Sequence, residues 1–400
     1  MNIKAIKWLY QELPELITKG VLTEEAAGKI RQYYGEVKSA SKTSIILIIS
    51  GTVGALLIGL GIISLLAHNW EQFSRFTRAL ISFMPLVIGQ VLALWVLWKK
   101  YESSAFKEAS ATFLSLMVGA SIALISQTYN IPGDTGTFIL TWMLLIVPVV
   151  YIMQASIPAA IYLVGITAWA GSYWGNPNKA ILFWPLAAVV FPHFIWALRR
   201  EIYVIRTTML SLIMIICISI GAGASLGKTW AGSWIIIFSS IYSIFYSIGC
   251  LKLDRFTTGW QWPLRVIGGA GIFILALQFT FRYVWQHFDS NYYGIRGKIS
   301  GISAFPDHIV TIALIVIAIL LFYDNAKRKD LTKSLLGALP LLAIIGFLFR
   351  GQVVLPLFIF NAYLLILSVS RILLGMQNNS LPMVNTGMLM LAILIIARFF

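Results

Sequence analysis

Two short polar sequences combine amide, aromatic and acidic groups, a combination that suits the binding of a sugar or a lipid headgroup. One contains Asn69 and Trp70, and the other contains Gln127, Tyr129 and Asp134. Both sequences follow long apolar segments. We therefore expect these residues to line one pocket at the extracytoplasmic face of a membrane protein.

Arginine residues could extend this pocket toward a phosphorylated ligand, because a guanidinium pairs with phosphate through two parallel N–H···O bonds. Arg75 and Arg78 follow the first polar sequence closely, and Arg282 lies much later in the chain. The polar sequences also have a structural interpretation. In it, the amides cap helix ends, the aromatic rings anchor at the membrane interface, and residues 132–134 form a turn. The sequence leaves both interpretations open.

The elements that must position these residues are apolar segments long enough to cross a membrane. The chain has 400 residues, of which 59% are apolar and 11% are charged, whereas about 25% are charged in soluble proteins. This composition excludes a water-soluble fold. A membrane-spanning helix needs roughly 20 mainly apolar residues. The predicted spans lie near residues 44–67, 79–98, 109–128, 137–154, 157–174, 180–198, 205–225, 230–251, 262–284, 307–323, 333–349, 352–374 and 382–398.

We therefore predict an all-α fold, a polytopic transmembrane helical bundle of about 13 spans preceded by a short cytoplasmic helical hairpin. Eleven or twelve spans are alternatives, because few residues around Gln154 separate the fourth segment from the fifth, and the last segment is short. The predicted organisation is a hairpin over residues 1–42, a first transmembrane unit over 43–160, and the remaining helices over 161–400.

Two amphipathic helices make up the predicted hairpin. In the first, apolar residues recur every three or four positions until Lys19 and Gly20, a pair typical of a helix end. Pro14 should break or restart this helix, because proline lacks a backbone N–H. Thr23 is the predicted N-cap of the second helix. The hairpin could lie on the cytoplasmic membrane face or dock a partner protein.

The positive charge of the protein indicates its orientation. The net charge is +15, from 30 Lys and Arg against 15 Asp and Glu. With the N-terminus in the cytoplasm, about two thirds of the basic residues fall in cytoplasmic segments, as the positive-inside rule requires. With thirteen spans the C-terminus would then lie outside. The charge is thus explained by topology, and we expect no nucleic-acid partner.

Titratable groups are scarce at membrane depth. The acidic residues all avoid the middle of the predicted spans, which argues against a transporter coupled through a carboxylate at that depth. His193, next to Pro192, could satisfy a carbonyl that the proline frees, or could serve in gating or proton transfer. Cys217 and Cys250 lack a metal-ligand spacing, so we expect no disulfide, no metal site and no cofactor.

Three stretches of the chain resemble one known family when they are taken together. They are residues 13–26, residues 61–70 with two arginines shortly after, and residues 126–134 followed by Trp142. Over about residues 9–160 the sequence resembles the bacterial membrane proteins grouped as domain of unknown function 2157. The resemblance implies a multispanning inner-membrane protein and brings no established activity.

These features predict a non-enzymatic integral inner-membrane protein with a polar outer-face pocket. It would be a transporter or flippase, or an accessory protein of envelope assembly, for a small or lipid-linked solute. Its partners would be the lipid bilayer, that solute and another membrane protein. The alternative is an extracytoplasmic glycosyl-transfer or polymer-ligation enzyme with a polyprenyl-linked donor, using acids such as Glu71 and Asp134 or the outer loop 285–306. A sensor with the hairpin as its output ranks last.

Overall fold

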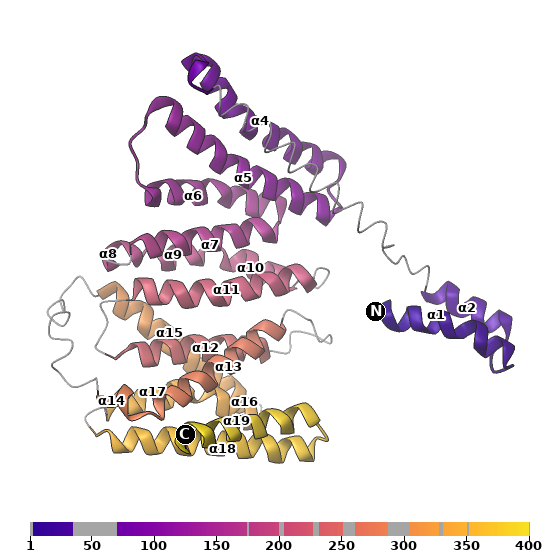
Figure 1. The fold of residues 1–400 in the computed structure, drawn as a ribbon, viewed down its shortest axis with the longest axis vertical. Coiled ribbons are helices and arrows are strands. Elements are labelled where there is room, and N and C mark those ends of the chain that lie inside the picture. Colours follow the sequence, from indigo (N-terminus) through magenta and orange to yellow (C-terminus); the bar gives the residue numbers. More distant parts are fainter. Residues whose placement is uncertain are drawn as a thin grey trace. The chain divides into compact units, whose positions relative to one another are not determined.

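The structure is a computed structural model that describes residues 3–34, 70–173, 176–199, 204–226, 232–250, 261–286, 305–327, 331–349 and 352–399. In these ranges the regular structure is helical throughout (Figure 1). The predicted all-α class is therefore confirmed for this part of the chain. The chain divides into two compact units, residues 1–78 and residues 79–400, and each is described by itself.

The first unit contains helices α1 (Ile3–Thr18) and α2 (Glu24–Tyr34) and a 3-10 turn, η1 (Trp70–Gln72). Helices thus occupy both predicted N-terminal segments. They pack against each other, and Leu13 of α1 and Ala27 of α2 are buried. That this helix pair forms a cytoplasmic cap stays a prediction.

Local signals set the ends of these two helices. α1 stops before Gly20, whose φ of +69° is a backbone conformation that glycine adopts without strain. Thr23 caps α2 as predicted, because its hydroxyl accepts the backbone N–H three residues later at 3.3 Å. The prediction that Pro14 breaks the first helix is wrong, since α1 continues through it. Proline removes one backbone donor, and the next turn still closes, with Lys19 N–H donating to Glu15 C=O at 3.0 Å.

Successive helices of the second unit lie side by side in a layered stack (Figure 1). Helices that are neighbours in sequence pack together, as α6 (Thr135–Met153) does with α7 (Ser156–Ser172), and α7 also packs against α11 (Val204–Ser225). The helices that follow η1 are α4 (Arg75–Lys99), α5 (Ser104–Tyr129), α6 (Thr135–Met153), α7 (Ser156–Ser172), α8 (Pro177–Ala180), α9 (Phe183–Ala188), α10 (Phe191–Arg199), α11 (Val204–Ser225), α12 (Trp234–Cys250), α13 (Gln261–Phe279), α14 (Arg282–Gln286), α15 (Phe305–Lys327), α16 (Leu331–Gly337), α17 (Leu339–Leu348), α18 (Val354–Gln377) and α19 (Leu381–Phe399).

Eight candidate spans in the described ranges are long and apolar enough to cross a membrane: α4, α5, α6, α11, α15, α18, α19 and the segment Asn178–Ala197. Four further apolar helices are shorter. Apolar side chains such as Leu94 and Trp98 of α4 are exposed, as they would be in contact with lipid. The chain is therefore a multi-pass membrane protein. The total of about 13 spans stays a prediction, and its first segment, 44–67, lies outside the described residues.

Prolines interrupt two of the predicted spans. The segment predicted at 180–198 begins at the last residue of α8 and contains α9 and most of α10, with Pro185 inside α9 and Pro192 inside α10. The segment predicted at 333–349 consists of α16 and α17, and Pro340 lies in the first turn of α17. Proline lacks the N–H that would continue the helical hydrogen bonds. The carbonyls that these breaks release need other donors.

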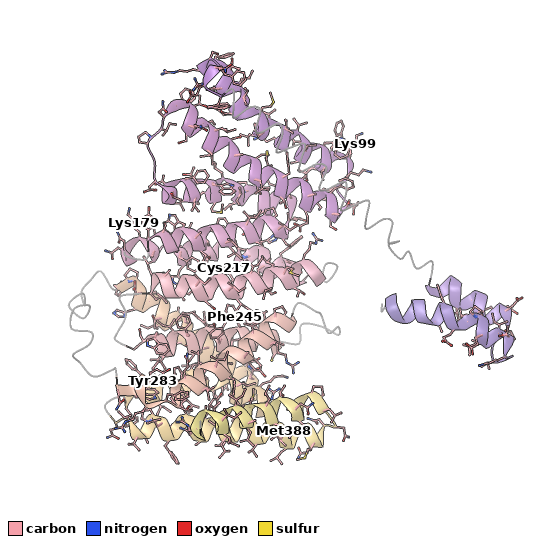
Figure 2. The ribbon with its side chains drawn as sticks, in the orientation of Figure 1. Lys99, Lys179, Cys217, Phe245, Tyr283 and Met388 are labelled. Carbon is pink, nitrogen blue, oxygen red and sulfur yellow. The ribbon has the colours of Figure 1, made fainter. Side chains whose placement is uncertain are left out.

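Two buried apolar clusters hold the second unit together. The first includes Tyr162 and Ile166 of α7, and the second includes Trp285 of α14 and Phe360 of α18. The rings of Trp285 and Phe360 stack with their centroids 5.7 Å apart, an arrangement that adds to the burial energy of the aromatic rings. Lys99, at the end of α4, lies at the opposite end of the helices from residue Lys179 of α8 (Figure 2).

Candidate functional site

A largely buried ion pair joins two helices that are far apart in the sequence. Glu108 lies near the start of α5 and exposes 5% of its surface, and Arg206 lies in the first turn of α11. Arg206 Nη1 lies 2.6 Å from Glu108 Oε1. Taking either charge out of water alone would be costly, so each residue compensates the other. The pair therefore fixes the start of α5 to the start of α11.

The same carboxylate also holds the start of α7. Ser156 N–H donates to Glu108 Oε1 at 2.8 Å, and Ile157 N–H donates to Glu108 Oε2 at 2.9 Å. The first N–H groups of a helix have no partner inside the helix, and the helix dipole favours a negative charge there. Gln154, with a φ of +53°, ends α6 and turns the chain sharply into α7. One carboxylate thus joins α5, α7 and α11.

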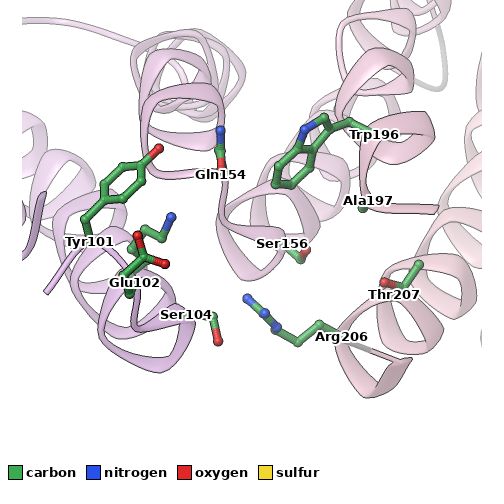
Figure 3. A pocket seen from close by; sticks show the side chains of 10 residues that line it. Tyr101, Glu102, Ser104, Gln154, Ser156, Trp196, Ala197, Arg206 and Thr207 are labelled. Carbon is green, nitrogen blue, oxygen red and sulfur yellow. The ribbon is translucent and has the colours of Figure 1, made fainter. Parts of the chain in front are cut away.

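A cavity of about 160 Å³ opens beside this ion pair. Its walls come from the α4–α5 turn, the α6–α7 turn, α10 and α11. In Figure 3, Tyr101 and Glu102 lie on one side, and Trp196 and Arg206 lie on the other. Polar groups from four places in the sequence therefore converge on one small space.

Both signs of charge and two aromatic rings line this cavity. Lys107 and Arg206 supply positive charge, and Glu102 supplies negative charge. Lys107 Nζ lies 4.2 Å from the centroid of the Tyr101 ring, within the range of a cation–π contact. Trp196 lines the other wall. Charged walls in a chain this apolar mark the cavity as the candidate functional site.

His193 lies buried on α10, behind Trp196. Its ring stacks on the Trp196 ring at 5.7 Å with an interplanar angle of 29°, and it meets the Tyr151 ring edge-on at 6.2 Å. His193 Nε2 is buried and has no hydrogen-bond partner among the described residues. The imidazole therefore supports the cavity wall by packing on Trp196.

Two tyrosines satisfy backbone carbonyls near the helix breaks beside Pro192. Tyr162 Oη donates to Leu186 C=O at 2.9 Å, and Tyr151 Oη donates to Val189 C=O. Leu186 C=O also accepts the Val189 N–H at 3.2 Å, so the Tyr162 hydroxyl is its second donor, whereas Pro192 has no N–H to offer the Val189 carbonyl three residues earlier. Satisfying such a carbonyl is one of the two roles that the sequence leaves open for His193, and the structure shows tyrosine hydroxyl groups of the neighbouring helices α6 and α7 bonded to these two carbonyls.

Three of the predicted pocket residues lie around the α5–α6 connection. Gln127 and Tyr129 are exposed on the last turn of α5. Asp134 is exposed and caps α6, because its Oδ1 accepts the N–H of Thr137 at 2.5 Å. That backbone hydrogen bond, with a smaller contribution from the Thr137 hydroxyl, holds the pKa of Asp134 below its usual value. Asp134 therefore has a structural role at this helix end.

The other predicted pocket residues do not all join this group. Asn69 lies outside the described residues. Trp70 is buried in η1 and Arg75 is exposed at the start of α4, both in the first unit. Arg282 is exposed on α14, which several helix layers separate from the α5–α6 connection (Figure 1). The second unit therefore does not bring Arg282 to Gln127.

Sequence reasoning misses the pairing of Glu108 with Arg206, although two signals for it were present. Arg206 falls inside the apolar segment predicted at 205–225, and Glu108 borders the segment predicted at 109–128. An arginine in an apolar helix needs a partner. The sequence does not identify the acidic residue that pairs with Arg206, because Glu108 and Arg206 are 98 positions apart.

The fold defines a class, the multi-pass α-helical membrane proteins. Residues 14–159 match the family described as "Predicted membrane protein (DUF2157)". The resemblance to domain of unknown function 2157 is thereby confirmed over this range, which includes Lys107 and Glu108 and ends before Arg206. No curated protein and no solved structure matches the chain.

Proposed function

We propose that this protein is a non-enzymatic inner-membrane protein with a cytoplasmic N-terminus that transports or flips a small or lipid-linked solute. The charged cavity beside Glu108 and Arg206 is the observation that carries this proposal. Ligand sites in helical membrane proteins form between helices, where a few polar groups converge in apolar surroundings. The cavity has this composition.

The location of the cavity supports a role at the cytoplasmic surface. It lies beside the α4–α5 turn, where Lys99 and Lys100 precede Tyr101. The positive-inside rule assigns this basic turn to the cytoplasm. A solute would therefore enter or leave the proposed site on the cytoplasmic side of the bilayer.

The opposite end of α5 offers a second proposed contact. Its last turn exposes Gln127 and Tyr129. An amide and an aromatic ring are groups that could contact a ligand at the outer face. With the cavity at the first turns of α5, both proposed contacts lie on one helix. Replacing Gln127 and Tyr129 by alanine should then slow transport without emptying the cavity of its ligand.

A lipid-flipping assay tests the proposal. The full chain is reconstituted into liposomes that contain a fluorescent phospholipid, and the label that becomes accessible to a membrane-impermeant quencher is followed over time. We expect faster exposure of label than in protein-free liposomes, a slower rate for Lys107→Met, and an unchanged rate for the matched control Lys99→Met. A rate equal to that of protein-free liposomes, for labelled lipids and for small solutes trapped inside, would refute a transport function.

A further inference from the structure

The cavity is the size of one small chemical group. Pockets for drug-sized ligands have volumes of about 300–1,000 Å³, and this cavity measures about 160 Å³. It therefore suits a headgroup or a small solute and not a large one.

The balance of charge around the cavity favours a ligand with no net charge. Lys107 and Arg206 carry positive charge at its wall, Glu102 carries negative charge there, and Glu108 is paired with Arg206 behind the wall. A singly charged ligand would leave one charge of the site uncompensated, at a cost that is greatest beside the Glu108–Arg206 pair, where Glu108 is buried. A zwitterion adds no net charge, provided that each of its two charged ends contacts a wall residue of opposite charge.

The geometry of the walls separates the two ends of such a zwitterion. Glu108 holds the Arg206 guanidinium in place, and a fixed planar guanidinium is well suited to phosphate. Glu102 lies on the other side of the cavity, beside Tyr101 (Figure 3). A carboxylate attracts an ammonium ion, and the Tyr101 ring beside it carries the Lys107 ammonium, whose Nζ lies 4.2 Å from the ring centroid.

The position of the cavity along the helices matches the depth of lipid headgroups. Its residues come from the α4–α5 and α6–α7 turns and from helix ends. Tyr101 and Trp196 are of the two residue types enriched at the membrane–water interface. Basic pockets between helices at this level are typical sites for lipid headgroups.

We propose that this cavity binds a zwitterionic group consisting of a phosphate joined by a short linker to a primary ammonium, as in the headgroup of an ethanolamine phospholipid. The phosphate contacts Arg206, Lys107 reaches it from the Tyr101 side of the cavity, and the ammonium contacts Glu102. The cavity is the one used in the proposed function, and this inference names the class of its ligand. It rests on the proposed function only for the claim that the ligand is transported, because binding itself requires no transport.

Native mass spectrometry of the full chain in detergent tests the binding. The protein is offered phosphatidylethanolamine, phosphatidylglycerol and phosphatidylcholine with identical acyl chains, and retained lipid is measured. We expect preference for phosphatidylethanolamine, because the glycerol lipid has no ammonium and the choline lipid has no N–H to donate. Lys107→Met should weaken retention about tenfold, as expected for the loss of one charged hydrogen bond, and Lys99→Met should leave it unchanged.

Glu102→Gln provides the sharper test. It removes the ammonium partner and leaves the wall with an excess of positive charge, so the preference should move from phosphatidylethanolamine to anionic phosphatidylglycerol. In a parallel titration with soluble phosphoethanolamine, binding of that molecule without retention of the lipid would identify a free solute as the source of the same group. Equal retention of the three lipids, or an unchanged preference in Glu102→Gln, would overturn the proposal. Selective binding without flipping would refute only the transport function.

Discussion

Arg206 donates from Nη1 to Glu108 Oε1 across 2.6 Å, although the two residues are 98 positions apart in the sequence. The same carboxylate accepts the first N–H groups of α7 at Ser156 and Ile157. Three helices therefore depend on one side chain, and the cavity wall formed by Arg206 is held in place before any ligand arrives. This arrangement leads to the first prediction.

Glu108→Ala should strongly destabilise the protein. The substitution leaves the Arg206 charge without its carboxylate and two N–H groups of α7 without an acceptor. Removing one partner of a buried ion pair costs about 3–5 kcal/mol. The free energy of unfolding, measured by denaturant titration in detergent micelles, should fall by up to this amount, because 20% of the Arg206 side chain is exposed to solvent.

The control for Glu108→Ala is Glu102→Ala, which removes an exposed carboxylate six positions earlier. Its effect on the free energy of unfolding should stay within about 0.5 kcal/mol. The double variant Glu108→Ala with Arg206→Ala should be less destabilised than the sum of the two single variants, because no isolated charge remains. Equal effects of Glu108→Ala and Glu102→Ala would contradict the role assigned to Glu108.

Asp134→Ala should destabilise the protein in a pH-dependent manner. The pKa of Asp134 in the folded protein lies below the usual 3.8, chiefly because the Thr137 backbone N–H binds the ionised carboxylate. This stabilisation is fully present above the usual carboxyl pKa and is lost as the pH falls through the lower folded-state pKa. The difference in melting temperature between native protein and Asp134→Ala should thus be largest at neutral pH and shrink in acid. Asp134→Asn, which keeps a capping oxygen but does not ionise, should lack this pH dependence relative to Asp134→Ala.

Gly268→Ala should loosen the packing of α13 on α12. A Cβ atom at Gly268 would lie 2.6 Å from the backbone nitrogen of Tyr246, so the helices would have to move apart. Overpacking of this kind costs about 1–3 kcal/mol. Gly269→Ala is the matched control on the same helix, because its Cβ would meet only the Tyr246 ring at 3.5 Å, an ordinary contact. Thermal unfolding of the two variants in detergent should separate them, and equal melting temperatures would argue against this close approach.

Cysteine labelling should establish the orientation of the helices. In a background without Cys217 and Cys250, single cysteines are placed at two exposed positions, Ile131 between α5 and α6 and Asn379 between α18 and α19. The predicted topology puts residue 131 outside and residue 379 in the cytoplasm. A membrane-impermeant maleimide applied to intact cells should therefore label the first position only, and the second after permeabilisation. Labelling of both positions from outside would mean an even number of crossings between them.

Much of the helical framework could be predicted from the sequence, because it depends on neighbouring residues. Apolar length locates the helices, Gly20 ends α1 where a positive φ is required, and Thr23 caps α2 through a bond three residues away. Pro14 shows the limit of such rules, since α1 tolerates the loss of one donor. Gly268 of α13 lies directly against the backbone of α12, a contact that links different helices.

The candidate site could not be predicted in the same way. Polar spacing pointed to Gln127, Tyr129 and Asp134, but Asp134 caps α6 and has a local role. Arg282 also carries suitable chemistry, yet its helix lies several layers from the α5–α6 connection. Residue type shows what a side chain can bind, and only packing shows which side chains meet.

By itself the sequence determined that this chain is an α-helical membrane protein, because the burial of apolar side chains in lipid is additive along a segment. The tertiary structure decided that Glu108 joins α5, α7 and α11, that Tyr151 and Tyr162 satisfy the carbonyls of α9 and its C-terminal end, and that a cavity with charges of both signs lies beside Arg206. These contacts link residues far apart in the chain. These contacts form only because particular helices lie next to one another in space, and no local sequence pattern specifies which helices become neighbours.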